Sequence, residues 1–159
     1  QDNIVEAIAW IDKAKPTNIL NEQFIKLLHK RMFGSVWKWA GEFRRSDKNL
    51  GVTWHQVPMC LKNLCDDVPV WIQTEDESPV EMAVRFHHRL VWIHPFSNGN
   101  GRHSRLMTDV FIKNVLFGSP FTWGRRDLSN PSEHRRRYID ALQEADNGNY
   151  IPLLEFAKS

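Results

Sequence analysis

The stretch HPFSNGNGRHSR, residues 94–105, constrains this chain more than any other segment. Apolar residues recur at helical spacing up to its start. Pro95 then restricts the residue before it and removes a backbone donor, so a helix must end close to His94. Two glycines permit a sharp turn, and a second helical stripe begins directly after them. The stretch therefore predicts a short loop that joins two helices.

The periodicity is helical almost throughout the rest of the chain. Apolar residues three and four apart, bounded by capping residues or glycines, predict helices over residues 4–14, 21–34, 58–73, 78–94, 100–118, 130–148 and 151–157. Two of these helices begin at capping-box patterns with proline at the first helical position, Ser78-Pro79-Val80-Glu81 and Asn130-Pro131-Ser132-Glu133. Pro69 lies inside another and should kink it. The expected fold class is all-α.

Residues 42–57, EFRRSDKNLGVTWHQV, break this pattern. They carry no helical stripe, and the turn-forming SDKNLG is flanked by residues that tolerate β structure. We expect an exposed β-hairpin within these residues, with its turn at SDKNLG. The predicted architecture is a single all-α domain over residues 1–159 with one β-hairpin. Because the chain starts at Gln1 instead of methionine, we also expect it to be a fragment that lacks upstream residues.

The composition is that of an ordinary globular protein, with 159 residues of which 42% are hydrophobic and 25% are charged. A net charge of +2 is too small to indicate a nucleic-acid partner. The chain contains no apolar run long enough for a bilayer, so we expect no membrane partner. Cys60 and Cys65 lack a second pair, which favours free thiols on a helix and a cytoplasmic location.

The chemistry of residues 94–105 follows from the predicted turn. Backbone N–H groups at a helix start lack intrahelical partners and, together with the helix dipole, form an anion site. Glycines let this backbone approach a ligand, and Asn100 offers an amide donor. Arg102 and Arg105 lie one turn apart on the same side, which suits a di- or triphosphate. With His94 able to accept a proton at neutral pH, the stretch indicates phosphoryl or nucleotidyl transfer.

Each part also has an ordinary structural interpretation. A histidine near a helix end commonly makes a structural hydrogen bond, glycine and asparagine between helices commonly form only a turn, and arginines three apart commonly line a solvated face. A metal cluster would need the four histidines at positions 87, 88, 94 and 103, although no cysteine or carboxylate completes the set. A His-Asn-His nuclease would use His94, Asn100 and His103, with a basic patch formed by Arg125, Arg126 and residues 135–137.

The order of these residues resembles the signature of Fic-domain (Fic/Doc) proteins, His-x-Phe-x-(Asp/Glu)-Gly-Asn-Gly-Arg-x-x-Arg, at every specified position except one. Residues 33–44, FGSVWKWAGEFR, resemble the segment that leads into the family's flap hairpin. Residues 138–156, YIDALQEADNGNYIPLLEF, resemble its C-terminal helices, so essentially the whole chain is covered. The subgroup that it resembles most is mobile mystery protein B, which implies a bacterial, toxin–antitoxin setting.

The resemblance implies the Fic fold, a helical bundle with a β-hairpin flap. It also implies a protein adenylyltransferase, which moves AMP from ATP to a Ser, Thr or Tyr hydroxyl of a target protein. His94 would be the general base, Arg102 would hold the phosphates, Arg105 would engage the γ-phosphate, and Phe96 would point into the core. The anion hole would be formed by Gly99, Asn100 and Gly101. The flap would pin an extended target segment by main-chain pairing through Asp47, Lys48, Asn49, Leu50, Gly51 and Val52.

Asn98 is the one departure from the signature. In the family this position is Asp or Glu, and its carboxylate coordinates a Mg²⁺ that bridges the α- and β-phosphates. Asparagine offers only a neutral carbonyl oxygen, so its hold on Mg²⁺ or Mn²⁺ should be much weaker. Three outcomes stay open: a metal held mainly by the nucleotide, another donor or metal, or a weakly active or inactive nucleotide-binding module.

Many Fic proteins carry an inhibitory motif, (Ser/Thr)-x-x-x-Glu-(Gly/Asn), whose glutamate pairs with the second arginine of the signature. This chain does not contain that motif. Ser129 and Glu133 have the required spacing, but His134 follows where glycine or asparagine is needed. The inhibitory element would then lie upstream of Gln1, come from an antitoxin-like partner, or not exist.

Overall fold

The computed structural model describes residues 2–126 and 130–159. Within them the chain forms α-helices over Asp2–Ala14 (α1), Glu22–Phe33 (α2), Val57–Thr74 (α3), Pro79–Ile93 (α4), Asn100–Val110 (α5), Pro131–Asp146 (α6) and Ile151–Lys158 (α7). A short 3₁₀ turn, Trp54–Gln56 (η1), precedes α3, and a π-helical segment, Phe111–Val115 (η2), continues α5. The all-α class expected from the sequence is confirmed.

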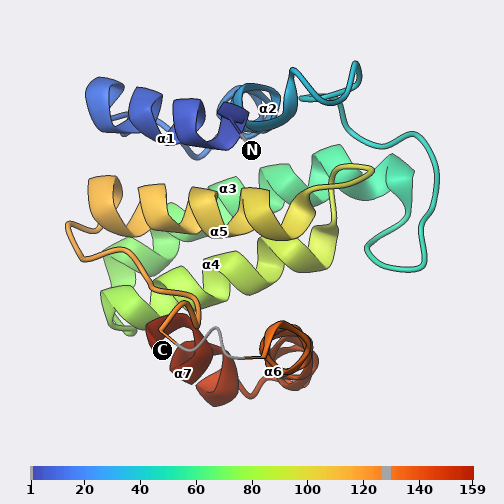
Figure 1. The fold of residues 1–159 in the computed structure, drawn as a ribbon. Helices are drawn as coiled ribbons and strands as arrows, with labels where there is room; N and C mark the ends of the chain where they lie inside the picture. The colour runs from blue at the N-terminus through green and yellow to red at the C-terminus, as the bar shows by residue number, and fades with distance from the viewer. Residues whose placement is uncertain (1, 127–129) are drawn as a thin grey trace.

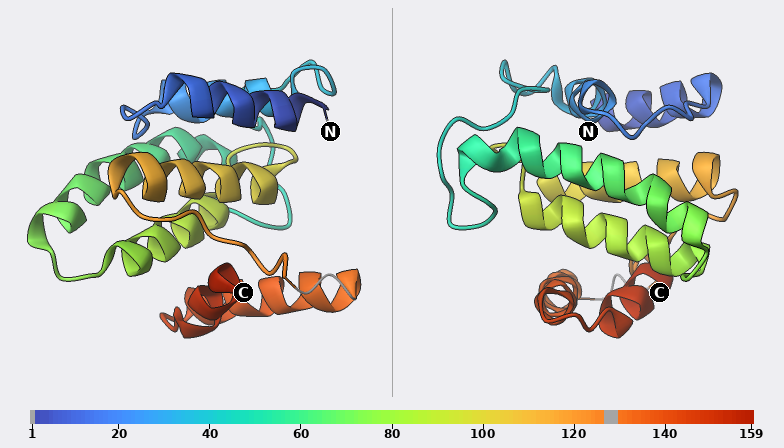
Figure 2. Two further views of the ribbon diagram at one scale, coloured as in Figure 1. Left: turned by 60° about the vertical axis from the view of Figure 1, so that its left-hand side comes forward. Right: turned by 180° about the vertical axis from the view of Figure 1, so that it is seen from behind.

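The helices lie in three layers (Figures 1 and 2). The first layer holds α1 and α2, the middle layer holds α3, α4 and α5, and the third holds α6 and α7. Helix α4 contacts α3, α5, α6 and α7, which places it at the centre. Its side chains Phe86 and Leu90 are fully buried, as is Met107 of α5. The loop between α4 and α5 is therefore held at both ends by helices of the core.

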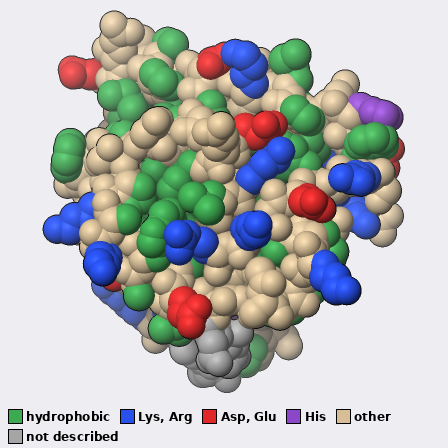
Figure 3. All heavy atoms as spheres, turned by 90° about the horizontal axis from the view of Figure 1, so that it is seen from above, with side chains coloured by type: hydrophobic (Ala, Val, Ile, Leu, Met, Phe, Trp, Pro, Cys, Tyr) green, Lys and Arg blue, Asp and Glu red, His purple; other side chains and the backbone are tan. Residues whose placement is uncertain are grey.

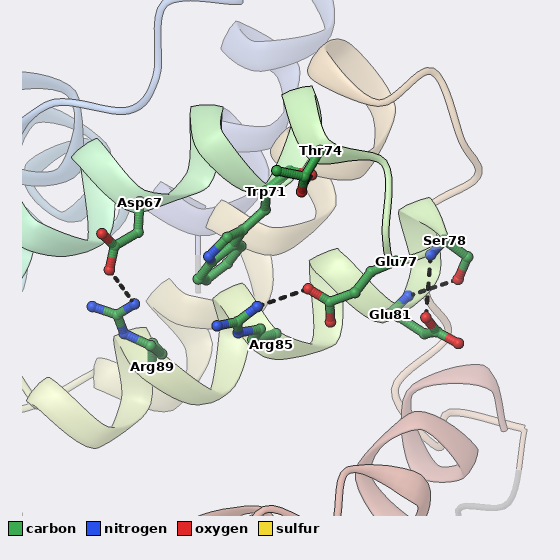
Figure 4. Close-up of polar contacts among 8 residues, drawn as sticks. All are labelled: Asp67, Trp71, Thr74, Glu77, Ser78, Glu81, Arg85 and Arg89. Carbon is green, nitrogen blue, oxygen red and sulfur yellow. Dashed lines mark hydrogen bonds and ion pairs between the residues drawn. The ribbon is translucent and has the colours of Figure 1, made fainter.

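Helix α4 starts at the capping box expected from the sequence (Figure 4). Ser78 Oγ accepts a hydrogen bond from Glu81 N, and Glu81 Oε2 accepts one from Ser78 N, both at 3.2 Å. At α6 only half of the pattern forms. Asn130 Oδ1 caps Glu133 N at 3.2 Å, but the Glu133 carboxylate pairs with Arg136 at 2.8 Å. Both helix starts are as expected, because one capping oxygen suffices to satisfy an orphan N–H group.

One ion pair and an aromatic ring join α3 to α4, and a second ion pair joins α4 to the connection between them (Figure 4). Arg89 pairs with Asp67 at 2.7 Å, and Arg85 pairs with Glu77 at 2.8 Å. The Arg85 guanidinium also lies 4.0 Å from the centre of the Trp71 ring. Such half-exposed pairs each contribute at most about 1 kcal/mol, so the buried apolar side chains of both helices dominate this contact.

The expected β-hairpin does not form: no strand is present in the described parts of the chain, and residues 34–56 are a loop apart from η1. Arg44 provides the physical reason. Its buried guanidinium donates hydrogen bonds to the carbonyl groups of Ser46, Val52, Ile93 and His94. The backbone N–H groups of Arg44 and Val52 donate to Pro95 O and Ile93 O, at 3.0 and 3.4 Å. Both arms thus bond to the end of α4, and the bonds between the arms run through the Arg44 and Asp47 side chains instead of through a backbone ladder.

The face uppermost in Figure 1, where α1 and α2 lie, carries interspersed apolar, basic and acidic side chains (Figure 3). Val5 and Ile8 of α1 are exposed apolar residues. Cys60 and Cys65 lie on α3 as free thiols, as the sequence predicts. Across residues 2–126 and 130–159, no helix combines the length and apolar character needed to cross a membrane.

Candidate functional site

The α4–α5 connection turns sharply at two positions with left-handed backbone. His94 ends α4 with φ 56°, and Gly99 precedes α5 with φ 78°. Between them Phe96 is fully buried, as expected. The Asn100 side chain accepts a hydrogen bond from Phe96 N at 3.0 Å and donates one to Phe96 O at 2.7 Å. Asn100 therefore holds the loop closed, and its amide is not the ligand donor that the sequence suggested.

His29 of α2 supports this loop from beneath. Its fully buried ring stacks on Phe96 with centroids 3.8 Å apart. Its Nδ1 accepts from the Gly41 N–H at 2.9 Å, so Nε2 carries the proton and donates to Asn98 O at 3.1 Å. Sequence reasoning missed this role, because a single histidine on the apolar face of a helix carries no signal of which distant loop it will meet.

Three buried histidines should make the fold sensitive to acid. Burial lowers the pKa of His29 to about 4 and the pKa values of His87 and His103 to about 3. In the unfolded chain each pKa returns to about 6.5, so below that pH the unfolded state binds more protons. The free energy of unfolding should therefore fall as the pH drops from about 6.5 toward 4, by on the order of 1 kcal/mol per pH unit for each histidine.

Urea unfolding at pH 7.5, 6.5 and 5.5 measures this effect. A His55→Gln variant serves as the control, because it removes an exposed histidine instead of a buried one. A free energy of unfolding that stays constant between pH 6.5 and 5.5 would contradict the assignment of neutral buried imidazoles.

An open cleft of about 540 Å³ lies in front of the start of α5. The loop joining α4 to α5 and the loop over residues 34–56 lie at the same end of the molecule (Figure 1). One part of the cleft wall is apolar and is formed by Leu50, Val91, Ile139 and Leu142. The other part carries the signature residues His94, Arg102 and Arg105. The cleft thus combines an apolar region with a cationic one.

The backbone N–H groups without an acceptor start one residue later than the sequence suggested for the anion site. The Gly99 N–H donates to Asn98 Oδ1 at 2.7 Å, so it is not free. The next three N–H groups, those of Asn100, Gly101 and Arg102, have no acceptor within the described residues. A Cβ added to Gly101 would meet only the end of the Arg105 side chain, at 3.7 Å, so the backbone here is open to the cleft. The free donors therefore begin at residue 100.

The two signature arginines lie on the same side of α5, as expected, and each rests on an aromatic ring. The Arg102 guanidinium lies 4.7 Å from the centre of the Phe33 ring, and that of Arg105 lies 4.6 Å from the centre of the Tyr138 ring. The Tyr138 hydroxyl is itself bonded to His87 Nε2 at 2.7 Å. Cation–π contacts hold guanidinium groups in place while leaving their N–H groups free for a ligand.

His94 is half-buried and faces the cleft. Burial, reinforced by the nearby charges of Arg44 and Lys48, lowers the pKa of its imidazole below the usual 6.5. No group in the described parts of the chain hydrogen-bonds its ring nitrogens, so the neutral ring is free to accept a proton. Gly51 of the loop lies against it: a Cβ at Gly51 would come 2.6 Å from the Cβ of His94.

Helix α6 supplies cleft residues that the sequence did not indicate. His134, Arg135 and Tyr138 all line the cleft. Arg135 belongs to the basic run that the sequence suggested as a patch, and Tyr138 was noted only within the segment that resembles the family's C-terminal helices. The missing information was the packing of α6 against the middle layer, which no local pattern encodes.

The residues around Asn98 do not fit a protein-held Mg²⁺. Asn98 is exposed, its side-chain oxygen is already bonded to Gly99 N–H, and no Asp or Glu of the described residues lines the cleft. Within the described residues there is likewise no group of three or more His, Cys, Asp and Glu side chains that could hold a metal ion.

The packing does not support the metal cluster or the nuclease site that the histidines could have formed. His87 bonds to Thr108 and Tyr138, while His88 bonds to Asp146. His103 is fully buried and its Nε2–H donates to Ile25 O at 2.9 Å. Because the histidines have separate partners and His103 cannot reach a substrate, neither a shared metal nor a His-Asn-His nuclease site is supported.

The comparison with known families decides the membership. A family model described as Fic/DOC family matches residues 19–112. The chain belongs to the Fic/DOC family. Its Fic domain resembles Fic-1 from C. elegans with a TM-score of 0.77 and 24% identity, covering 98% of this chain and 46% of that one. It also resembles BepC from Bartonella tribocorum with bound AMPPNP, with a TM-score of 0.70 and 17% identity, over 99% and 83% of the two chains. The expected Fic fold is confirmed.

Curated relatives of this Fic domain include the protein named protein adenylyltransferase Fic from Aedes aegypti. The two are 33% identical over 133 residues, which is 81% of this chain and 25% of that protein. The Drosophila melanogaster protein of the same name is 32% identical over the same shares. The Fic domain thus spans about a quarter of the length of these relatives.

Proposed function

We propose that this Fic domain is a protein adenylyltransferase that moves AMP from ATP to a hydroxyl group of a target protein. The observation that carries the proposal is the convergence on one cleft of three free backbone N–H groups, two aromatic-supported arginines and the unbonded imidazole of His94. The names of the curated relatives and the AMPPNP bound to BepC support the same activity.

The shape of the cleft suits a nucleoside triphosphate. Phosphates are held well at a helix start, where free N–H groups and the helix dipole favour negative charge. Guanidinium groups at Arg102 and Arg105 add bidentate donors for further phosphate oxygens. The apolar wall around Val91 and Leu142 accepts the flat base. A ligand with one apolar end and several negative charges at the other matches both regions.

The chemical step follows from this placement. The Nε2 or Nδ1 lone pair of neutral His94 removes the proton from the target hydroxyl, whose oxygen attacks the α-phosphorus of ATP. A new P–O bond forms as the bond from the α-phosphorus to the bridging oxygen breaks, and pyrophosphate leaves with that electron pair. Arg102 and Arg105 stabilise the charge that develops on the leaving group.

The loop over residues 47–52 is the proposed docking site for the target. Its first four side chains are exposed, and Leu50 lines the cleft while remaining 67% exposed. Through Gly51 the loop lies directly against His94. An extended target segment that pairs with this exposed backbone would bring its Ser, Thr or Tyr hydroxyl to the base, without the preformed hairpin expected from the sequence.

Labelled ATP provides the test. Incubation of the protein with a cell lysate should transfer label from α-³²P-ATP, but not from γ-³²P-ATP, to a protein band that resists phosphatase. Label from γ-³²P-ATP alone would show phosphoryl transfer instead. Cleavage of added RNA or DNA without protein labelling would restore the nuclease interpretation, and either result would overturn the proposal.

A second candidate is a Fic module that binds nucleotide without transferring it. The observation that favours this candidate is Asn98, which leaves the cleft without the carboxylate of the family signature. Calorimetric binding of ATP together with no label transfer, even from concentrated protein, would distinguish this module from the enzyme.

The finer assignments belong to the same proposal. The motif resemblance alone supports the mobile mystery protein B subgroup, a bacterial setting and an antitoxin-like inhibitor. The cytoplasmic location is proposed from the unpaired Cys60 and Cys65. Ser129, the first residue of the nearest inhibitory spacing, lies outside the described residues. Co-purification of a small partner that suppresses labelling would support the inhibitor, and its glutamate should face Arg105.

A further inference from the structure

The charge around the cleft is one-sided. Arg102, Arg105 and Arg135 line it together with His94 and His134, whereas Asp and Glu are absent from the lining among the described residues. None of the ion pairs in the described parts of the chain involves these three arginines. In addition, Arg105 Nε is buried without a partner there. Within the described residues these three guanidinium groups have no carboxylate partner, so they can bind an anionic ligand.

The carboxylate on α5, that of Asp109, lies in a neighbouring pocket that it shares with Arg102 and Arg105. Asp109 follows Arg105 by four residues but does not line the cleft. Its Oδ1 accepts hydrogen bonds from Trp123 Nε1 at 3.0 Å and from Phe121 N at 3.3 Å. Burial raises the pKa of this carboxyl group to about 6. Asp109 thus serves the packing of the segment before α6 and is not a ligand for a cation in the cleft.

The cleft offers few ligand atoms that suit a divalent cation. Mg²⁺ requires near-octahedral oxygen ligands at about 2.0–2.1 Å and is usually anchored through a carboxylate. Position 98 offers a neutral oxygen that already accepts the Gly99 N–H. A cation would also be repelled by the unpaired guanidinium groups nearby. The wall of the cleft favours the more negative form of a nucleotide over its metal complex.

We propose that this Fic domain binds its nucleotide as the metal-free polyanion, with Arg102, Arg105 and Arg135 supplying the positive charge that a carboxylate-held metal would otherwise supply. This inference rests on the proposed function, because it concerns the phosphates of the same nucleotide. ATP without Mg²⁺ carries two more negative charges than the magnesium complex and gains correspondingly more from three arginines and a helix start.

Isothermal titration calorimetry of ATP in EDTA and in excess Mg²⁺ tests the proposal on the unmodified chain. The Kd in EDTA should equal or fall below the Kd in Mg²⁺. A Kd at least tenfold higher in EDTA would overturn the inference while leaving nucleotide binding intact. Absence of binding under both conditions would overturn the proposed function as well, so the two failures are distinguishable.

Two variants sharpen the test, each checked for folding by circular dichroism. Asn98→Asp places a carboxylate beside the phosphates and should raise the ratio of the Kd in EDTA to the Kd in Mg²⁺ about tenfold, because the new charge repels the free anion and binds the metal. An unchanged ratio would contradict the role given to this position.

Arg135→Gln should weaken the binding of metal-free ATP about fivefold, the scale of an exposed charge contact. Its matched control is Arg136→Gln, since Arg136 is the next residue of α6, pairs with Glu133 and does not line the cleft. The control should leave the Kd unchanged. Equal effects of the two substitutions would show that Arg135 acts only through overall charge, and would remove it from the proposal.

Discussion

Replacing His94 with alanine should reduce the rate of AMP transfer at least about 100-fold, because a positioned general base contributes on the order of 10²–10⁴ to a rate. The Kd for ATP should stay within about twofold, since the phosphates are held by α5 and its arginines. Label transfer from α-³²P-ATP, followed alongside calorimetric binding, measures both quantities. His94→Asn provides a second variant, because asparagine adopts the left-handed backbone of this position readily.

The pH dependence of the same reaction reports on the same ring. Burial and the charges of Arg44 and Lys48 lower the pKa of His94, so the imidazole stays neutral down to a pH below 6.5. Only the neutral ring accepts a proton, and the rate should therefore be constant from pH 8 to 6.5 and fall on the acid side. Retention of label transfer by both His94 variants, or an inflection above pH 6.5, would overturn its assignment as the base.

Gly99→Ala should lower the free energy of unfolding by about 2–5 kcal/mol and weaken ATP binding. Gly99 has φ 78°, a conformation that costs an L-residue about 1–2 kcal/mol. The added Cβ would also lie 2.7 Å from Cε2 of Phe33, whose buried ring packs against His29 and has no room to move. Such overpacking adds about 1–3 kcal/mol. Urea unfolding and calorimetry measure the two effects.

Gly148→Ala is the matched control. Gly148 has a similar φ of 88°, but a Cβ there would meet nothing within 4 Å. This substitution should therefore cost only the backbone strain, about 1–2 kcal/mol, and should leave ATP binding unchanged. If both substitutions destabilise the protein equally, the contact between Gly99 and the Phe33 ring is not what requires glycine in the signature loop.

Much of the helical architecture was predictable because the signals are local. The spacing of apolar residues along α2 and α4 follows the helical repeat, and Ser78 and Pro79 mark a start that needs only neighbouring backbone groups. The helix expected over residues 58–73 forms as α3 from Val57 to Thr74, with Pro69 inside it.

The signature residues were predictable for the same reason, since one loop and one helix turn place them together. His94 does end α4, and Arg102 and Arg105 do project from one side of α5. Which polar atoms of the signature loop stay free for a ligand was less predictable. The Asn100 side-chain amide donates a hydrogen bond to the Phe96 carbonyl, and the Asn98 side-chain oxygen accepts one from the Gly99 N–H. Side-chain hydrogen bonds to nearby backbone compete with ligand binding, and only coordinates show which one wins.

The sequence by itself determined the helices, the sharp turn at Pro95 and the order of groups along residues 94–105, because each depends on backbone geometry within a few residues. Only the tertiary structure decided that Arg44 replaces a hairpin with a loop bonded to the end of α4. It also decided that His29 supports the loop and that Arg135 of α6 joins the cleft. These contacts join residues dozens of positions apart, so they depend on how the layers pack. That packing lines the cleft with Arg102, Arg105 and Arg135, and among the described residues it brings no carboxylate into the lining.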